Sequence, residues 1–493
     1  MNTIINRIFF GIVIVFAVQN ANTQNLLDAY RYSFQNPSGT ARYNGVSGAM
    51  NAIGADISLG SHNPAGIAAF WKSELAVSGD ISLLNSESSL LEAGNTNSTS
   101  GYGNSLNNAG IVFTSYTPNK NWMSKSFAIS FNKMADYTDE IYYQGKSLGS
   151  ISERWAALGT GLYPDELDDF EAGPAYDAGV IFDNEGDAIY EYDYFRNEDK
   201  RLSRNQVIDQ TGKWNELAIT FGGNYNNKLL LGATIGIDFI SFEIDKAYTE
   251  SDLEDQNVPQ FNELKYRELL TSSGIGVNAK LGALLKITES IRWSASLSSP
   301  TSLSMRENFR SLINYEWVNN DGSIGNGAWD TEENQFEYSF VNPWKVSTGF
   351  GYILGKNGFI DAEIDYVGYN FSKFKFSDGV ASDIEYENFL NQEIDSRFEN
   401  AINFRIGGEY VLSSFRLRAG YQILGSPIAS YDDMSGFSLG LGYRGENWFL
   451  DLAYVNRGQM VTYQPYELLD AVVPTVDIDK RISNIGLTIG FKI

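Results

Sequence analysis

The sequence predicts an all-β fold, a 14-stranded antiparallel transmembrane β-barrel with a small N-terminal helical hatch inside the lumen. Three observations predict it. Strand-like segments alternate in polarity every second residue, the connections between them are alternately short and long, and the chain begins with an apolar export segment. Outer-membrane barrels have tight turns on one rim, long loops on the other and an even number of strands. A soluble sandwich has no reason to keep that asymmetry.

Residues 1–23 are predicted to be a signal peptide. Arg7 precedes the apolar run Ile8–Val18, and small residues follow at Ala21 to Thr23, so cleavage is expected before about Gln24. At roughly eleven residues the run is too short for a transmembrane helix. The chain has no cysteine, which excludes disulfides, thiolate metal sites and a lipoprotein anchor. We therefore expect an exported protein that gains rigidity by closing its sheet.

Residues 24–71 are predicted to form the hatch. The stretch Leu26–Phe70 has little period-2 pattern and many glycines and alanines, which allow short helices and turns to pack in a confined space. Asn63 and Pro64 predict a turn, because proline fixes φ and asparagine bonds to neighbouring backbone groups.

The barrel is predicted over residues 72–493. In Leu229–Phe239 the odd-numbered residues are apolar and the even-numbered residues are mostly small or polar, and Ile275–Leu285 alternates in the same way. Successive side chains point to opposite faces of a strand, so one face suits lipid and the other a lumen. Charges expected on the lumen face are Arg292, Asp361, Glu363, Asp365, Arg405, Glu409, Arg416, Arg418 and Asp451. On the lipid face each would cost roughly 2–4 kcal/mol near the midplane.

The connections fall into two classes. Tight links are expected at Pro118–Ser124, Asn226–Asn227, Thr288–Ser290, Gly355–Gly358, Leu412–Ser414 and Gly445–Asn447. Long excursions are expected at Asn85–Asn107, Asp136–Lys213, Tyr248–Leu264, Arg306–Gln335, Ser372–Arg397, Gly425–Met434 and Gly458–Lys480. The formal net charge of −25 resides mostly in these long loops and excludes nucleic acid as a partner, because phosphates require a basic surface.

The last strand resembles the signal that the outer-membrane assembly machinery reads. Asn484 and Gly486 are followed by spaced hydrophobic residues, including Ile489 and Phe491. An ordinary final strand of a soluble sheet is the alternative for this segment alone. Together with the signal peptide it predicts the outer membrane of a Gram-negative bacterium, with membrane lipid, lipopolysaccharide and the assembly machinery as partners.

A family resemblance is carried by several stretches in order. The first comprises Gly45–Asp56 and Asn63–Ile67, with Asn63-Pro64-Ala65-Gly66 at its centre. The others are Arg292–Ser304, Pro343–Tyr352 with Asp361–Tyr366, and Arg405–Tyr410 with Arg416–Tyr421. Together they resemble the FadL/TodX family of outer-membrane transporters of hydrophobic compounds. Leu297 stands where the family usually has an aromatic residue, and the middle loops match nothing in the family pattern.

The resemblance implies passive inward transport of a hydrophobic small molecule, such as a long-chain fatty acid or an aromatic hydrocarbon, with no cofactor. It also implies that Asn63, Pro64, Ala65 and Gly66 belong to a gate, and that the solute leaves sideways where the third strand is kinked. That strand is expected at Lys125–Met134, but no proline or glycine marks a kink in it. A plain tight turn is the alternative for the Asn-Pro motif.

The loop Asp136–Lys213 holds the candidate ligand contacts Trp155, Leu158, Leu162 and Phe170. The first three are spaced i, i+3, i+7, which predicts one side of a short helix. Packing of this helix on the barrel rim is the alternative. The same loop is acidic, and Asp183–Asp187 lacks the full spacing of a calcium loop, so we expect a solvated acidic surface rather than a metal site.

Two other function classes are alternatives to transport. An enzyme is not expected, because His62 is the only histidine and no serine motif accompanies it. A structural or adhesive barrel, whose acidic aromatic loops bind a surface partner, is the main alternative. A lumen without an apolar pocket would favour it.

Overall fold

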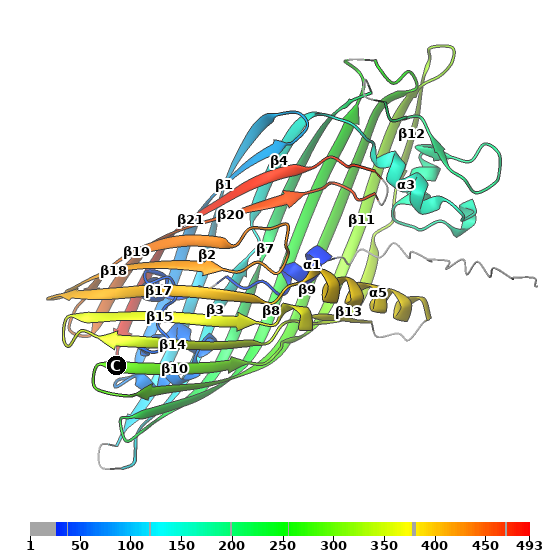
Figure 1. Cartoon of the computed structure of the whole chain (residues 1–493). Coiled ribbons are helices and arrows are strands. Elements are labelled where there is room, and N and C mark those ends of the chain that lie inside the picture. The colour runs from blue at the N-terminus through cyan, green and yellow to red at the C-terminus, as the bar shows by residue number, and fades with distance from the viewer. Residues whose placement is uncertain are drawn as a thin grey trace, which may run out of the picture.

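A computed structural model describes residues 26–36, 38–117, 120–197, 200–254, 256–376, 381–468 and 471–493. The predicted signal peptide, residues 1–23, lies outside them. The predicted 14-stranded antiparallel barrel is confirmed: β1 (Glu74–Leu90) pairs with β21 (Val476–Lys492), which closes the sheet (Figure 1). Among the described residues no helix is long and apolar enough to cross a membrane.

Several strands of the barrel are interrupted, so the sheet contains more strand segments than the barrel has strands. β3 and β4 both pair with β7 and together form one barrel strand, as do β10 and β11, which both pair with β9. β13 and β14 form the next barrel strand, because they pair with β11 and β10. The other strands are β2 (Asn95–Tyr116), β3 (Trp122–Asp136), β4 (Asp139–Ser147), β5 (Ile181–Phe182), β6 (Glu191–Tyr192), β7 (Leu202–Tyr225), β8 (Leu229–Ser251), β9 (Phe261–Lys286), β10 (Ile291–Ser298), β11 (Ser302–Val318), β12 (Ile324–Asp330), β13 (Asn334–Val341), β14 (Lys345–Ile353), β15 (Gly358–Val367), β16 (Lys373–Phe376), β17 (Ala401–Leu412), β18 (Phe415–Leu424), β19 (Met434–Arg444) and β20 (Trp448–Tyr463).

The helices are short and lie in the N-terminal segment and the long loops. They are α1 (Leu26–Arg31), α2 (Ala41–Asn44), α3 (Ile151–Gly159), α4 (Ala172–Asp177) and α5 (Ala381–Arg397), with 3-10 turns η1 (Ile57–Ser61), η2 (Pro64–Ala69), η3 (Pro164–Glu166) and η4 (Tyr369–Phe371).

One rim of the barrel carries the predicted tight links, except that Pro118 and Asn119 of the first link lie outside the described residues. Between β7 and β8 both Asn226 and Asn227 have φ of 52°, the left-handed conformation that a two-residue hairpin requires. Glu74 at the start of β1 opposes Lys492, so the barrel begins and ends on this rim.

Several expected excursions are wrong in extent, because strands occupy most of them. β1 and β2 leave only four residues between Leu90 and Asn95 where Asn85–Asn107 was expected as a loop, and β8 and β9 continue into Tyr248–Leu264. The upper half of β2 has mostly small polar residues on both faces. Apolar and polar residues therefore do not alternate there, and the sequence does not predict a strand.

The barrel wall is tall on one side and short on the other. β8 has 23 residues and β9 has 26, whereas β14 has 9 and β18 has 10. At about 3.3 Å per residue, β8 is on the order of 75 Å long and β18 about 33 Å. Leu231, Ile235 and Phe239 are exposed on the outer face of β8, and charges follow at Glu243 and Asp245.

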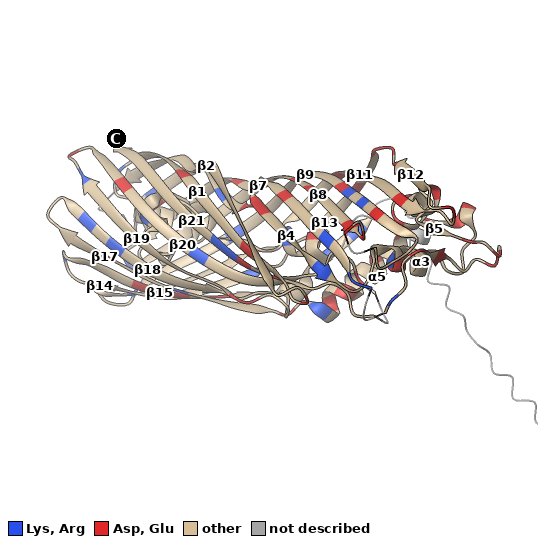
Figure 2. Ribbon diagram, turned by 90° about the horizontal axis from the view of Figure 1, so that it is seen from above, with Lys and Arg blue, Asp and Glu red and all other residues tan. Residues whose placement is uncertain are grey.

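The outward apolar residues therefore define a lipid-facing belt, and the tall wall rises beyond it as an extracellular stalk. Figure 2 shows acidic and basic residues along β8, β9 and β11 in this part of the molecule.

Candidate functional site

The N-terminal segment, residues 26–70, packs against glycines on the inner wall. Gly232 of β8 pairs with Gly282 of β9, and a Cβ at either would overlap Asn63, Pro64 or Ala65. Another pair, Gly407 of β17 and Gly420 of β18, leaves the corresponding space for Val46. We call these pairs the glycine seats. Because the segment contacts strands from distant parts of the sheet, it lies in the bore.

The Asn-Pro motif starts η2 in this segment. Asn63 Oδ1 accepts a hydrogen bond from the Ala65 N–H at 3.2 Å, and Asn63, Pro64, Ala65 and Gly66 are all buried. The motif is thus a capped turn whose backbone rests on a glycine seat. Its gating role and the status of residues 24–71 as a separate hatch stay predictions.

Polar groups hold the other side of the segment. The Ala52 N–H donates to Asp361 Oδ2 at 3.1 Å, and the Asn51 side-chain amide donates to Glu363 Oε2 at 2.8 Å. Most of the predicted lumen charges that are buried form ion pairs: Arg405 with Asp365 at 2.8 Å, and Arg418 with Glu409 at 2.7 Å and Asp451 at 2.8 Å. Asp361, which is also buried, accepts the Ala52 hydrogen bond instead. Buried charges require such partners.

A small polar chamber lies beside the segment. It has a volume of ≈ 40 Å³, room for a few water molecules or one carboxylate group but no alkyl chain. Its lining includes Ser33, Asn36, His62, Asn278, Lys280, Thr301, Asn342, Lys345, Asp365, Asn403 and Arg405. Lys280 pairs with Glu216, and Arg405 with Asp365. Of the three cationic side chains, only that of Lys345 has no hydrogen bond or ion pair among the described residues.

His62 is a packing residue in this chamber. Its ring stacks on Tyr43 with centroids 4.8 Å apart, and Nε2 lies 3.3 Å from the carbonyl oxygen of Ser38. Burial, helped by the nearby Lys345 and Arg405, lowers the pKa of His62 to about 3. The imidazole is therefore neutral at physiological pH.

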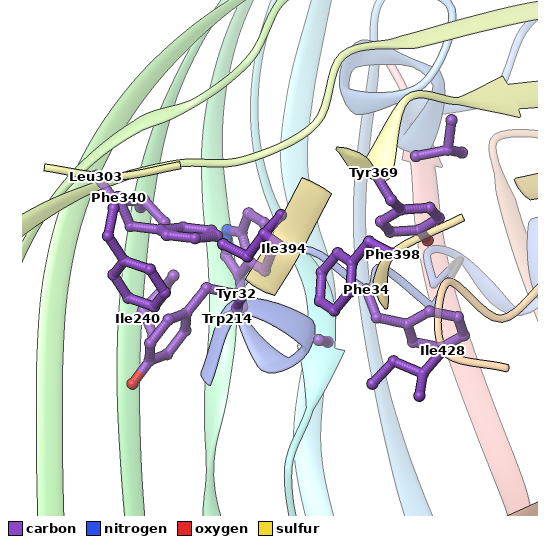
Figure 3. Close-up of a cluster of buried hydrophobic side chains, with 14 of the residues drawn as sticks. Tyr32, Phe34, Trp214, Ile240, Leu303, Phe340, Tyr369, Ile394, Phe398 and Ile428 are labelled. Carbon is purple, nitrogen blue, oxygen red and sulfur yellow. The ribbon is translucent and has the colours of Figure 1, made fainter. Parts of the chain in front are cut away.

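An apolar plug fills the bore on the extracellular side of the chamber. Tyr32 and Phe34 of the N-terminal segment meet Trp214 and Ile240 of the tall wall and Ile394 of α5 (Figure 3). Met134, Val367 and Tyr369 belong to this plug and also line the chamber. The polar chamber and the apolar plug are thus contiguous.

Inside the stalk, an apolar vestibule continues the plug outward. It includes Phe242 and Ile244 of β8, Leu270 of β9 and Phe309 of β11. Phe170, a predicted ligand contact, reaches this vestibule: its ring centroid lies 5.9 Å from that of Phe309 and 5.6 Å from that of Phe336.

The other predicted ligand contacts lie in a cap over the stalk, a cluster of buried side chains from α3, α4 and the ends of neighbouring strands. Trp155 of α3 is fully buried against Tyr266, and Leu158 is partly buried in the same cap core. The expected helix is found, but Leu162 lies beyond its end. Gly161, with φ of +91°, takes a conformation that breaks helices. Trp155 and Leu158 pack in the cap core, and their role as ligand contacts stays a prediction.

The wall has a slit beside the third strand, where the resemblance implied a sideways exit but no proline or glycine marked a kink. β2 pairs with β3 only from Asn108 to Tyr116, and above Asn108 no backbone ladder joins β2 to β3 or β4. Side chains bridge the gap instead: Lys213 Nζ donates to the Asn104 carbonyl at 2.8 Å, and Thr99 Oγ1 donates to the Glu140 carbonyl at 2.6 Å.

The slit begins where β3 leaves its register. The pairing of β3 with β7 shifts between Lys133 and Ala135, at the end of the expected third strand, and β4 resumes at Asp139. No proline or glycine is needed, because a one-residue bulge bends a strand without them. The run of small polar residues in β2 was the signal available in the sequence.

The N-terminal segment bonds to the foot of the slit. Asn132 Nδ2 donates to Ser61 Oγ at 2.6 Å, the Asn36 N–H donates to the Met134 carbonyl at 3.1 Å, and Tyr137 Oη donates to the Arg31 carbonyl at 3.1 Å. A shift of the segment would therefore act directly on the slit.

The predicted assembly signal forms the end of β21. Ile489 and Phe491 are 45% and 47% exposed and face outward, while Asn484 Nδ2 donates to Asp80 Oδ2 at 3.2 Å. Gly486 pairs with Asp80 in the closing ladder. Recognition of this strand by the assembly machinery stays a prediction.

Comparisons with known proteins agree with the barrel. A family model described as "Uncharacterised protein family (UPF0164)" matches residues 11–152. No curated protein matches the sequence. A Pseudomonas aeruginosa FadL homologue is 12% identical, with 93% of this chain and 99% of that chain covered and a TM-score of 0.54. The P. putida toluene transporter TodX is 11% identical, with 93% of this chain and 99% of that chain covered and a TM-score of 0.54. At these identities the likeness establishes the fold, and the predicted FadL/TodX resemblance is confirmed at that level.

Proposed function

We propose that the protein is an outer-membrane channel for the passive uptake of long-chain fatty acids or similar lipophiles, released sideways into the membrane. The observation that carries the proposal is the contiguous series of buried apolar side chains from the vestibule through the plug to the polar chamber. The likeness to a FadL homologue and a toluene transporter supports a hydrophobic solute. The proposal assigns no enzymatic reaction to the protein.

The polar chamber favours an amphiphile over a plain hydrocarbon. A carboxylate in the chamber would meet the ammonium group of Lys345, while its alkyl chain would take the place of plug side chains such as Met134 and Val367. A hydrogen bond to a charged group contributes about 1.5–3 kcal/mol. Toluene has no group that could use this contact.

The slit is the proposed exit. Its foot, Asn108, pairs with Ser78 of β1, and Ser78 pairs with Thr488 of β21. The outward neighbours at this height, Val77 and Leu487, are 43% and 49% exposed and belong to the lipid-facing belt. A solute leaving here would enter lipid without crossing water.

The test is binding of oleate and of oleyl alcohol to the purified protein, measured by isothermal calorimetry. We expect Lys345→Gln to raise the Kd for oleate about tenfold and to leave that for oleyl alcohol unchanged. Lys228→Gln, on the tight-turn rim, is the matched control and should change neither. If the wild-type protein binds neither compound, the transport proposal fails. Equal losses for both compounds would reject the headgroup assignment.

A structural or adhesive barrel is the second candidate. The observation that favours it is the filled bore, in which the plug and the vestibule are packed side chains and the chamber holds only ≈ 40 Å³. For this candidate we expect no lipophile to co-purify with the protein in mild detergent. Mass spectrometry of the extracted protein decides between the two.

The outer-membrane setting is part of the proposal. The β21 strand would be read by the assembly machinery, and the charged outer surface of the stalk would contact lipopolysaccharide. Paired charges such as Arg267 and Asp245, 2.5 Å apart, lie on that surface.

A further inference from the structure

The upper edge of β16 is closed by a helix rather than by a strand. β16 pairs with β13 on one side, and α5 lies along its other edge. The Phe374 N–H donates to Asn391 Oδ1 at 2.9 Å, and Asn391 Nδ2 donates to the Phe374 carbonyl at 3.0 Å. The Phe376 N–H donates to Glu387 Oε2 at 2.8 Å. Side chains of α5 thus do what the backbone of a neighbouring strand does elsewhere.

The spacing of these side chains fits the strand. Glu387 and Asn391 are four residues apart, which places them on one helix face about 6 Å apart along the axis. Phe374 and Phe376 are two residues apart, about 6.6 Å along the strand. α5 therefore takes the place of a strand in the barrel wall at this point.

The inner face of this helix belongs to the plug. Leu390 and Ile394 are 4% and 1% exposed and pack in the plug. On the outside, Ile384 and Phe389 are 50% and 52% exposed. The helix is the only described layer between the plug and the outside here, since β16 has no second strand partner among the described residues.

The C-terminal end of α5 is fixed to the wall. The Glu399 N–H, two residues beyond the helix, donates to the Pro427 carbonyl at 2.8 Å. Phe398 forms a β-bridge with Ile428. The backbone holds this end of the helix, whereas side chains hold its middle.

α5 stands directly above the lipid-facing belt. Tyr366 of β15 and Ile402 of β17 are paired, face outward and are 39% and 61% exposed. β15 ends one residue later at Val367, which already belongs to the plug. The lipid surface and the plug therefore adjoin each other at the foot of α5.

We propose that α5 is a lateral entrance, which swings about its C-terminal attachment and admits single-chain amphiphiles from the outer leaflet directly into the plug. The inference rests on the proposed uptake function and adds a way in that bypasses the cap. Opening here breaks the side-chain hydrogen bonds from Asn391 and Glu387 to β16 and the stack of Tyr386 on Phe376, and it uncovers Leu390 and Ile394. Opening at a paired strand of the same rim would break a backbone ladder.

The first test is thiol labelling, which needs no solute. The chain has no cysteine, so Ile394→Cys places one thiol behind the helix. Leu303→Cys, equally buried at 1% in the same plug but on β11, is the control. In vesicles carrying the folded barrel, a water-soluble maleimide should label Ile394→Cys at least tenfold faster. Equal rates would overturn the entrance.

The second test cross-links α5 to β16. Tyr386 and Phe376 stack with centroids 5.9 Å apart, so cysteines at both positions can be joined by a bis-maleimide with a reducible spacer. The control staple joins Ser339→Cys to Lys375→Cys, which are paired across β13 and β16. We expect oleate uptake to fall at least tenfold with the α5 staple and to recover on reduction, with the control within twofold of wild type.

The outcomes separate this inference from the proposed function. Unchanged uptake with the α5 staple overturns the entrance while uptake itself stands. If the wild-type protein moves no oleate, the uptake function fails, and the labelling rates alone decide whether α5 opens.

Discussion

The slit and α5 are two interruptions of the barrel wall within the described residues, and they are closed differently. At the slit, strands stand side by side and side chains such as Lys213 and Thr99 bridge them. At α5, a strand is missing and a helix takes its place through Asn391 and Glu387. The slit starts within the lipid-facing belt, whereas α5 stands at its upper edge.

Both places show that a barrel can remain closed where its backbone ladder ends. Each side-chain hydrogen bond contributes about 0.5–1.5 kcal/mol net, so a few of them close a wall without making it permanent. The N-terminal segment connects both places. Ser61 and Asn36 bond to the foot of the slit, and Tyr32 and Phe34 share the plug with α5.

Stapling the slit should give the largest effect. Cysteines at Thr99 and Glu140 join β2 to β4, and we expect oleate uptake to fall at least tenfold because the exit is shut. Ser89→Cys with Thr96→Cys, a pair already in the β1–β2 ladder, is the control and should stay within twofold.

The two staples differ in what they trap. With the slit closed, bound oleate should accumulate in the protein, whereas with α5 closed loading should fail. Release at the wild-type rate from the slit-stapled protein would reject the slit as the exit.

Asn63→Ala combined with Pro64→Ala should abolish uptake and leave a heat-modifiable folded barrel. Loss of the cap alone costs about 1 kcal/mol, which shifts the segment on its glycine seat without unfolding the sheet. Uptake of labelled oleate by cells and a gel-mobility assay measure the two properties. Unchanged uptake would remove the gating assignment.

The smallest expected effect is the pH dependence of the segment's packing. His62 has a folded pKa of about 3, against an ordinary value of 6.5. Below pH 6.5 the unfolded chain binds a proton that the folded protein does not, so the free energy of unfolding should fall on acidification between pH 6.5 and 3. The limiting slope is about 1.4 kcal/mol per pH unit.

His62→Asn removes this contribution. Urea unfolding in lipid vesicles, followed by tryptophan fluorescence at several pH values, should show a shallower acid loss for the variant. Carboxylates titrate in both proteins, so the difference between the curves isolates the imidazole. Parallel curves would contradict the assignment.

The barrel could be predicted because period-2 alternation and turn chemistry are local. Asn226–Asn227 and the alternation in Leu229–Phe239 each report their own geometry. The upper half of β2 could not be predicted, because small polar residues on both faces leave no period. α5 could not be placed in the wall, because its contact with β16 depends on two segments that the local pattern does not connect.

The site was predicted only in part for the same reason. The Asn-Pro turn is local, but its glycine seat comes from β8 and β9, far along the chain. Trp155 was an ambiguous candidate, because one apolar helix face suits a cap core as well as a ligand. Lys345 was missed, because its position in the chamber follows from contacts between β14 and the N-terminal segment.

The glycine seats constrain the order in which the molecule can be assembled. Val46 and Pro64 pack directly on glycines of strands that lie much later in the chain. The contacts are too close for the folded N-terminal segment to slide into a barrel that has already closed. We therefore expect the N-terminal segment to be in place before the last strand pairs with the first and closes the barrel.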